Sequence, residues 1–312
     1  MKRFAASSSR TFDDFELVVV DDGSTDRTPE VLEGWRQRDS RVVVVTSPTN
    51  QGIPAALNLG LAHARGTYVA RLDSDDLMLP RRVAEQVAVL DARSEVVLVS
   101  CAFEIVDSAG NHLGTWGESA PHEITAFLLH FINPVGGGQA MFRLAEVLEE
   151  GGYAPEYPVS EDYELWVRLR RRGRIEMLPF VGMTRRTHAN QSLARWGGVK
   201  RAIWIRIMRS SLEPYLRRCV RDDEIAALIT VWRFDGSLDR SGIADDVMRE
   251  AFARFRGEVP DRAVQTCARR RIARQWYAAA RNFAARGHPI EAMKYLTRAV
   301  RWLITPRTIA TA

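Results

Sequence analysis

Short runs of Val and other β-branched residues alternate with amphipathic segments over the first hundred residues. The alternation predicts four buried strands, at residues 16–20, 41–46, 67–72 and 96–105. Helices of about 10–13 residues are predicted between them, at residues 29–38, 53–65 and 80–92. We expect Thr28 to cap the first helix and Gly66 to end the second. Strands separated by helices of this length predict an α/β fold, with a mostly parallel sheet and helices on both faces.

The alternation becomes irregular after residue 105. A helix is predicted at residues 161–172, with short strands at 140–142 and 180–186. From residue 199 the pattern is helical, with segments at 202–219, 224–232, 243–255, 262–286 and 290–302. We therefore expect an α/β domain over residues 1–195 and a helical region over residues 196–312.

Composition and charge support two parts with different partners. The chain is 46% hydrophobic and 27% charged, which is enough apolar residue for a folded core. Residues 196–312 hold 23 Lys and Arg against 12 Asp and Glu, whereas residues 1–195 hold 21 against 27. The basic part suits phosphate, anionic lipid or nucleic acid.

Several protein classes are disfavoured. No uncharged apolar run reaches the roughly 18 residues that a membrane-spanning helix needs. The first 15 residues contain no apolar segment of the kind found in secretory signals. The three cysteines, Cys101, Cys219 and Cys267, share no metal-ligand spacing, so we expect reduced thiols. These features together predict a cytoplasmic protein.

Two acidic clusters follow predicted strands. Asp21 and Asp22 come after ELVVV, and Asp73, Asp75 and Asp76 come after TYVARL. Ligands of open α/β sheets bind outside the carboxyl ends of the strands. Carboxylates gathered there repel one another unless a cation or a hydrogen-bond donor offsets their charge. The pattern favours Mg²⁺ or Mn²⁺, held by one or two carboxylates and substrate phosphates. The alternative is that both clusters are solvated turns and helix caps.

Three further features are candidates for a chemical role. Asp162 lies in the first turn of the helix predicted from residue 161, where an acid stabilises the helix dipole but can also be catalytic. Residues 136–138 are three glycines, which predict a flexible loop; the Lys-Ser/Thr pair of a phosphate-binding loop does not follow them. His188 is isolated, and an isolated histidine is more often structural.

Three segments carry a resemblance to a known family. They are VVVDDGSTDRT, NQGIPAALNLGLAHARGTYVARLDSDDLMLP and GGYAPEYPVSEDYELWVRL, and they resemble the family 2 glycosyltransferases of GT-A fold over roughly residues 11–192. The resemblance implies transfer of a sugar from a nucleotide-diphosphate donor, such as a UDP-sugar, to an acceptor hydroxyl with inversion. It also implies a divalent metal, Mg²⁺ or Mn²⁺.

The resemblance assigns roles to five of the acids. Asp22 matches the acid that hydrogen-bonds uracil, and Asp21 sits beside it at the nucleotide. Asp75 matches the metal ligand, and Asp73 lies near the ribose or the metal. Asp76 is expected to support these ligands.

Two more residues match positions of the family on the acceptor and diphosphate sides. Asp162 of SEDYELW matches the general base, and His188 of RRTHANQS matches the polar residue of a loop that closes over the diphosphate. No covalent nucleophile is implied.

The sequence departs from the family at its start. Members begin with a strand of type VSVIIPxYN and a long helix, but here only residues 4–10 resemble the end of that helix. In the family this strand lies between the strands that end at Asp21 and Asp73. Without it, buried backbone groups lack partners, at about 1–3 kcal/mol each. We expect the sequence to be part of a longer gene product; the alternative is a degenerate copy.

The expected partners are a nucleotide-sugar donor and a glycan or lipid-linked acceptor, in surface polysaccharide or glycolipid synthesis. Competing hypotheses are an inactive nucleotide-sugar-binding remnant, and a nucleic-acid-binding protein that uses residues 262–307. Nucleic acid is the weaker hypothesis, because no reader motif is present.

The last fifty residues interleave charges and apolar residues in a way that allows two interpretations. They form either a packed helix pair with a solvated basic face, or a peripheral contact with an anionic membrane at its inner face. The apolar residues in question are Ile272, Trp276, Phe283, Tyr295, Leu296, Ala299, Trp302 and Leu303.

Overall fold

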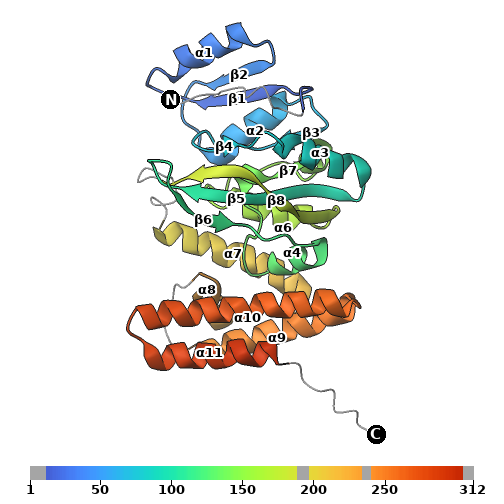
Figure 1. The fold of residues 1–312 in the computed structure, drawn as a ribbon, viewed down its shortest axis with the longest axis vertical. Coiled ribbons are helices and arrows are strands. Elements are labelled where there is room, and N and C mark those ends of the chain that lie inside the picture. Colours follow the sequence, from blue (N-terminus) through green and yellow to red (C-terminus); the bar gives the residue numbers. More distant parts are fainter. Residues whose placement is uncertain (1–11, 188–196, 234–239, 305–312) are drawn as a thin grey trace. The chain divides into compact units, whose positions relative to one another are not determined.

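The computed structural model describes residues 12–187, 197–233 and 240–304. The chain forms two compact units (Figure 1). The first comprises residues 1–125 and 133–203, and the second comprises residues 126–132 and 204–312. The chain therefore enters the second unit briefly before it returns to complete the first.

A small parallel sheet begins the first unit. Strand β1 (Leu17–Asp22) pairs with β2 (Val42–Ser47) in a register that sets Asp22 opposite Ser47. Helices α1 (Thr28–Arg38) and α2 (Ile53–His63) follow these two strands in turn. Two expected helix ends were wrong, the start of α1 by one residue and the end of α2 by two. The Asp26 carboxylate accepts the N–H of Thr28, so Thr28 is already helical. Extended backbone at Ala64 ends α2 before Gly66.

A larger, mixed sheet makes up the rest of the first unit. Its order is β3-β7-β5-β8-β4, with β6 also paired to β5. Of these pairings, β5 with β8 is parallel, and the other four are antiparallel. The strands are β3 (Tyr68–Ala70), β4 (Leu77–Met78), β5 (Val96–Val106), β6 (His112–Trp116), β7 (Met141–Arg143) and β8 (Arg174–Arg186).

The α/β class is confirmed, but the prediction of a mostly parallel sheet was wrong for this larger sheet. Strands β5 and β6 are joined by a short hairpin loop, and a loop of that length can join antiparallel strands only. Gly110 in this loop has a φ of 91°, which favours glycine. Hydrophobic alternation reports burial and does not report strand direction.

Helices cover both faces of the larger sheet. On one face, α3 (Arg82–Ala92) packs Leu90 against a cluster that includes Met141 of β7. On the other, Trp166 of α6 (Glu161–Leu169) lies 5.7 Å from Phe142 of β7, between ring centroids. Met141 and Phe142 are successive strand residues and point to opposite faces, so β7 is buried on both. The shorter elements are α4 (His122–Leu128), a 3₁₀ turn (Gly137–Gln139) and α5 (Leu144–Glu149).

The strand that the family places between β1 and β3 has no counterpart among residues 12–187. Within that range, β1 pairs with β2 alone and β3 pairs with β7 alone. No described strand bridges the expected gap.

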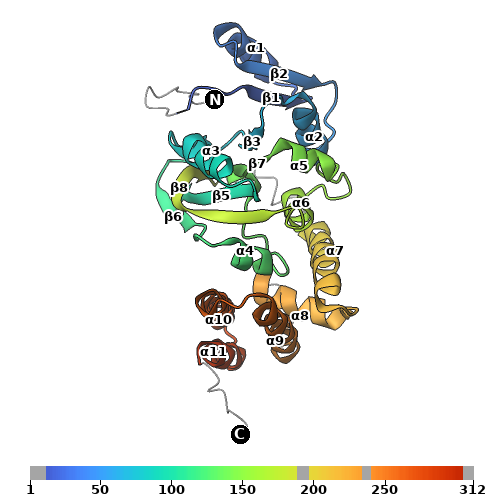
Figure 2. The same cartoon turned by 90° about the vertical axis from the view of Figure 1, so that its right-hand side faces the viewer.

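The second unit is helical, as predicted. It contains most of α7 (Gly197–Leu216), then α8 (Asp222–Arg233), α9 (Ser241–Glu258), α10 (Arg262–Ala285) and α11 (Pro289–Leu303). The two long last helices lie antiparallel and side by side (Figures 1 and 2). Trp276 of α10 packs on Tyr295 of α11, with ring centroids 5.3 Å apart, and Phe283 lies 4.7 Å from the same ring. No helix in the described ranges is both long and apolar enough to cross a bilayer.

The segment of residues 126–132 supplies aromatic core to this second unit. Phe127 lies 4.7 Å from Phe255 of α9, and Phe131 stacks on Trp232 of α8 with ring centroids 5.3 Å apart. No feature of the sequence indicated that these residues leave the first unit.

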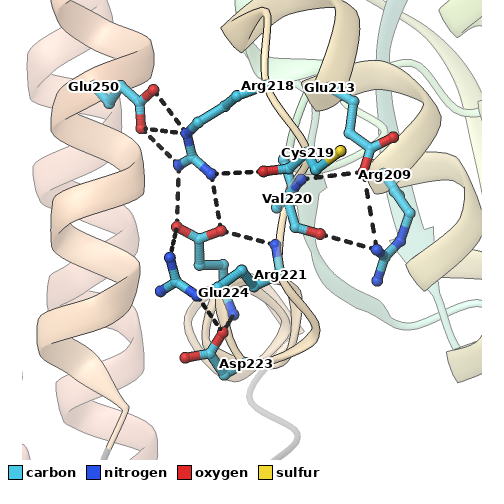
Figure 3. A network of polar contacts seen from close by, with 9 residues as sticks. All are labelled: Arg209, Glu213, Arg218, Cys219, Val220, Arg221, Asp223, Glu224 and Glu250. Atoms are coloured by element: carbon cyan, nitrogen blue, oxygen red, sulfur yellow. Dashed lines mark hydrogen bonds and ion pairs between the residues drawn. The ribbon is translucent and has the colours of Figure 1, made fainter.

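A polar network joins three of its helices (Figure 3). The Arg218 guanidinium donates to Glu224 at 2.9 and 3.0 Å and to Glu250 at 2.6 Å. The Glu224 carboxylate also accepts the backbone N–H of Arg221 at 2.8 Å. Burial raises the pKa of Glu224, but these hydrogen bonds outweigh burial, so the pKa is lowered. Arg218 thereby ties the end of α7 to the start of α8 and to α9.

Candidate active site

The first acidic cluster lies in the turn at the carboxyl end of β1. Asp21 is buried, and its carboxylate accepts the N–H of Ser24 at 3.0 Å. Asp22 accepts the N–H groups of Gln51 and Gly52, both at 2.9 Å, at the start of α2. The two acids thus lie at the carboxyl end of β1, where they were predicted. Their contacts to nucleotide remain predictions.

The second acidic cluster is joined to α6 by an arginine. Arg71 donates to Glu161 at 2.9 Å and to Asp73 at 3.2 and 3.3 Å. The side chains of Arg71 and Glu161 are 11% and 7% exposed, whereas that of Asp73 is 46% exposed. Burial lowers the pKa of Arg71, but Asp73 and Glu161 outweigh burial and raise it. A permanently charged guanidinium therefore holds the loop after β3 against the start of α6.

Asp162 is held beside this ion pair. Its carboxylate accepts the N–H of Gly137 at 2.8 Å and that of Tyr163 at 2.6 Å. Burial raises the pKa of Asp162, and the nearby charge of Asp73 raises it further, against the opposing effect of Arg71. The structure thus brings Asp162 and Asp73 into one electrostatic neighbourhood. A carboxylate with a raised pKa is a stronger proton acceptor than an ordinary one.

Asp76 anchors the acidic loop to β8. Its carboxylate accepts the N–H of Arg186 at 3.2 Å. Burial, together with the charges of Asp73 and Asp75, raises the pKa of Asp76 to about 6. Asp76 therefore lies close enough to Asp73 and Asp75 for their negative charges to affect its proton affinity.

The glycine run packs against these charged groups. A Cβ on Gly137 would lie 2.5 Å from a guanidinium nitrogen of Arg71. A Cβ on Gly138 would lie 3.3 Å from a carboxylate oxygen of Asp73 and 3.4 Å from one of Asp76. The prediction of a flexible loop is replaced by a specific role: these positions are glycine because charged side chains fill the space that a Cβ would take.

A buried arginine that the sequence analysis missed supports the whole arrangement. Arg82 is fully buried and donates to the carbonyls of Gly138 and Arg71, both at 2.9 Å, and of Ala140 at 3.1 Å. Burial lowers the pKa of Arg82 to about 10. One signal was available, because Arg82, Gln86 and Leu90 recur every four residues and form the buried stripe of α3. Arg71 and Glu161 gave no comparable signal.

The carboxylates of the acidic loop suit a metal ion whose remaining ligands would come from the substrate. Among the described residues, no three His, Cys, Asp or Glu side chains converge as a metal site. Asp75 and Asp73 offer carboxylate oxygens, and Mg²⁺ typically binds through one or two carboxylates plus substrate phosphates. Asp73 is paired with Arg71, and Asp75 is the residue that the family resemblance assigns to the metal. His188 lies outside the described residues.

The amino-acid sequence is similar to those of known glycosyltransferases. The family described as Glycosyl transferase family 2 matches residues 2–152. An uncharacterized glycosyltransferase of Haemophilus influenzae is 26% identical over 242 residues, which cover 73% of this chain and 75% of that protein. The amylovoran biosynthesis glycosyltransferase AmsE of Erwinia amylovora is 28% identical over 201 residues, 64% of this chain and 75% of that protein.

A solved structure shares the fold. Residues 1–349 of S. aureus TarS, crystallised with UDP-GlcNAc, superpose with a TM-score of 0.55 at 17% identity, over 94% of this chain and 85% of that chain. The same protein without that ligand gives a TM-score of 0.53 at 18% identity, over 96% and 86% of the two chains.

Proposed function

Because the chain belongs to family 2 of the glycosyltransferases and has the GT-A fold, we propose that it transfers a sugar from a UDP-sugar to an acceptor hydroxyl with inversion. One observation carries the proposal. Arg71 joins Asp73, at the end of the sheet where a donor is expected, to the helix that presents Asp162.

The nucleotide end of the donor is assigned to β1. Asp22 has a fixed position because two backbone N–H groups hold its carboxylate. We propose that it recognises uracil, with Asp21 beside it. The complex of TarS with UDP-GlcNAc supports a UDP-sugar as donor class.

The diphosphate end is assigned to the acidic loop. Asp75, with help from Asp73, would hold Mg²⁺ or Mn²⁺. When bound, such an ion neutralises charge on the departing diphosphate. Arg71 and Arg82 fix the backbone and the carboxylate on the protein side of this loop, which keeps the ligands in place before donor arrives.

The acceptor side is assigned to Asp162. The carboxylate takes the proton of the acceptor hydroxyl as that oxygen attacks the anomeric carbon, an effect typically of about 10²–10⁴-fold in rate. The Gly137 N–H orients one carboxylate oxygen. Burial supports the role, because it raises the proton affinity of Asp162.

We infer the class of acceptor from the names of similar proteins. AmsE is named for amylovoran biosynthesis, which supports a glycan or lipid-linked acceptor in surface polysaccharide or glycolipid synthesis. We place this reaction in the cytoplasm, at the inner face of the membrane.

A thermal-shift screen of nucleotide sugars, with and without Mn²⁺, tests the proposal. A donor at 100 times its Kd stabilises the folded protein by about 2.7 kcal/mol, which raises Tm by several degrees. We expect UDP-sugars to stabilise the protein more with Mn²⁺ than without it, and ADP-sugars to serve as the matched control. No stabilisation by any nucleotide sugar would contradict the donor assignment. Stabilisation without UDP release, in the presence of acceptor glycans, would instead indicate an inactive binding protein.

A further inference from the structure

Helix α11 has a second apolar face that the second unit leaves exposed. Tyr295, Ala299 and Trp302 form its buried face. Other large apolar side chains of the same segment are between 46% and 69% exposed. We call them the α11 stripe: Ile290, Met293, Val300, Leu303 and Ile304.

The stripe is continuous along the helix. Met293, Val300 and Leu303 lie on one side of the helix, at spacings of seven and three residues, and the half-buried Leu296 lies between them. Single exposed apolar residues are common on protein surfaces and need no explanation. Here five of the twelve large apolar side chains exposed among the described residues fall within residues 290–304. This concentration indicates a surface that is covered when the protein acts.

The charges beside the stripe indicate what covers it. Lys294 and Arg301 are exposed, and the helical spacing sets them on the surface next to the stripe. Arg298 is half-buried, with its guanidinium over the ring of Trp276. Glu291 is the one acid of α11, and residues 262–303 hold ten Lys and Arg in all. A second copy packed stripe to stripe would bring these cations together at the seam, where like charges repel. An anionic surface would attract them.

We propose that α11 binds the surface of an anionic membrane, with the stripe toward the acyl chains and the cations among the headgroups. A helix with one apolar face and basic flanks lies in the bilayer interface. Each Lys or Arg near an anionic surface contributes about 1 kcal/mol. The contact needs no membrane-spanning helix.

The structure changes which residues serve this contact. The sequence alone suggested Trp276, Trp302 and their neighbours as headgroup-layer residues. Trp276 and Trp302 are buried within the second unit and are therefore committed to packing. Of the apolar residues named from the sequence, Leu303 belongs to the stripe, and its other members are new. If the proposed function holds, membrane binding would also concentrate the enzyme where a lipid-linked acceptor is dissolved.

Co-sedimentation of the full chain with vesicles tests the proposal, without donor, so that its outcome is independent of transferase activity. We expect binding to phosphatidylcholine vesicles that contain phosphatidylglycerol, little binding to phosphatidylcholine alone, and loss of binding at high salt. The double variant Met293→Ser and Val300→Ser should lower the partition coefficient at least tenfold. Arg301→Glu should lower it more than about fivefold, which is the fold-change that corresponds to about 1 kcal/mol.

Control variants away from α11 show whether vesicle binding depends on the stripe itself or on any exposed apolar or charged side chain. Leu113→Ser and Leu148→Ser remove exposed apolar side chains of the first unit, and Arg27→Glu reverses an exposed charge there. All three should bind vesicles like the wild type, and all variants should keep their melting temperature. Equal binding to anionic and neutral vesicles at low salt would overturn the proposal. A stripe variant that dissociates a dimer in sedimentation velocity, with vesicle binding unchanged, would assign the stripe to a second copy instead.

Discussion

Replacing Arg71 with methionine removes the cation that joins the acidic loop to α6. Glu161 would then be left in a buried place without its guanidinium partner. Methionine fills much of the same volume, so the change tests charge and hydrogen bonding more than packing.

The expected cost follows from the exposure of the three side chains. Removing one partner of a buried ion pair costs about 3–5 kcal/mol. The two bonds to the half-exposed Asp73 add at most about 1 kcal/mol. Burial already raises the pKa of Glu161, so protonation of Glu161 relieves part of the cost. We expect a loss of about 3–4 kcal/mol at neutral pH, a large part of the usual 5–15 kcal/mol.

The assay is a double-mutant cycle in urea denaturation. The cycle compares Arg71→Met, Glu161→Gln and the double variant. Glu161→Gln should rescue much of the loss, which gives a coupling energy of about 2–3 kcal/mol. The pH dependence has a definite sign. Without Arg71 the folded-state pKa of Glu161 lies further above its ordinary value, so stability is lost as pH rises through that pKa. Arg71→Met should therefore be less damaging at pH 5 than at pH 8.

Two results would refute this reasoning. One is additivity of the two substitutions within about 0.5 kcal/mol, which would mean that the ion pair is not the source of the cost. The other is a cost no greater than that of Arg36→Met, which breaks only the exposed ion pair with Glu33.

Three further outcomes are expected. Asp75→Asn should abolish the Mn²⁺-dependent part of donor stabilisation in a thermal shift, and retained stabilisation would exclude Asp75 as a ligand. Asp162→Asn should lower turnover about 10²-fold or more while donor affinity changes little; equal losses of both would point to a structural role. Arg218→Leu should cost about 2–3 kcal/mol at pH 7, measured by urea denaturation. The pKa of Glu224 is lowered in the folded protein, so Glu224 contributes stability at pH values above its ordinary pKa. This stability is lost as pH falls through the lowered pKa, so the variant should differ least from wild type in acid.

The positions of the main elements could be predicted from the sequence because they depend on local patterns. Each of the four strands predicted in the first hundred residues is found, and the five C-terminal helices lie close to their expected ranges. Strand direction was not predictable, since β7 pairs with β3 and β5 through contacts between distant residues. The short strands β4 and β6 were also missed.

The acids of the candidate site could be predicted from local sequence, whereas the residues that position them could not. The acids at strand ends stand out in the sequence, because runs such as DSDD are rare and follow apolar segments. The partners that position them do not. Arg71 and Glu161 are 90 residues apart, and neither neighbourhood indicates the pairing. Arg82 sits in an ordinary helical pattern, and only the fold shows that three backbone carbonyls converge on it.

The excursion of residues 126–132 into the second unit bears on how this protein can be recombined with its relatives. A helical region that was contiguous in sequence would be exchangeable as a single cassette. Here Phe127 and Phe131 are encoded within the catalytic half, yet they fill the core around Phe255 and Trp232. A chimaera that swapped only the residues after 203 would pair these two rings with a foreign core. Exchange between homologues is therefore restricted to crossovers that carry both pieces, and the two units are constrained to diverge together.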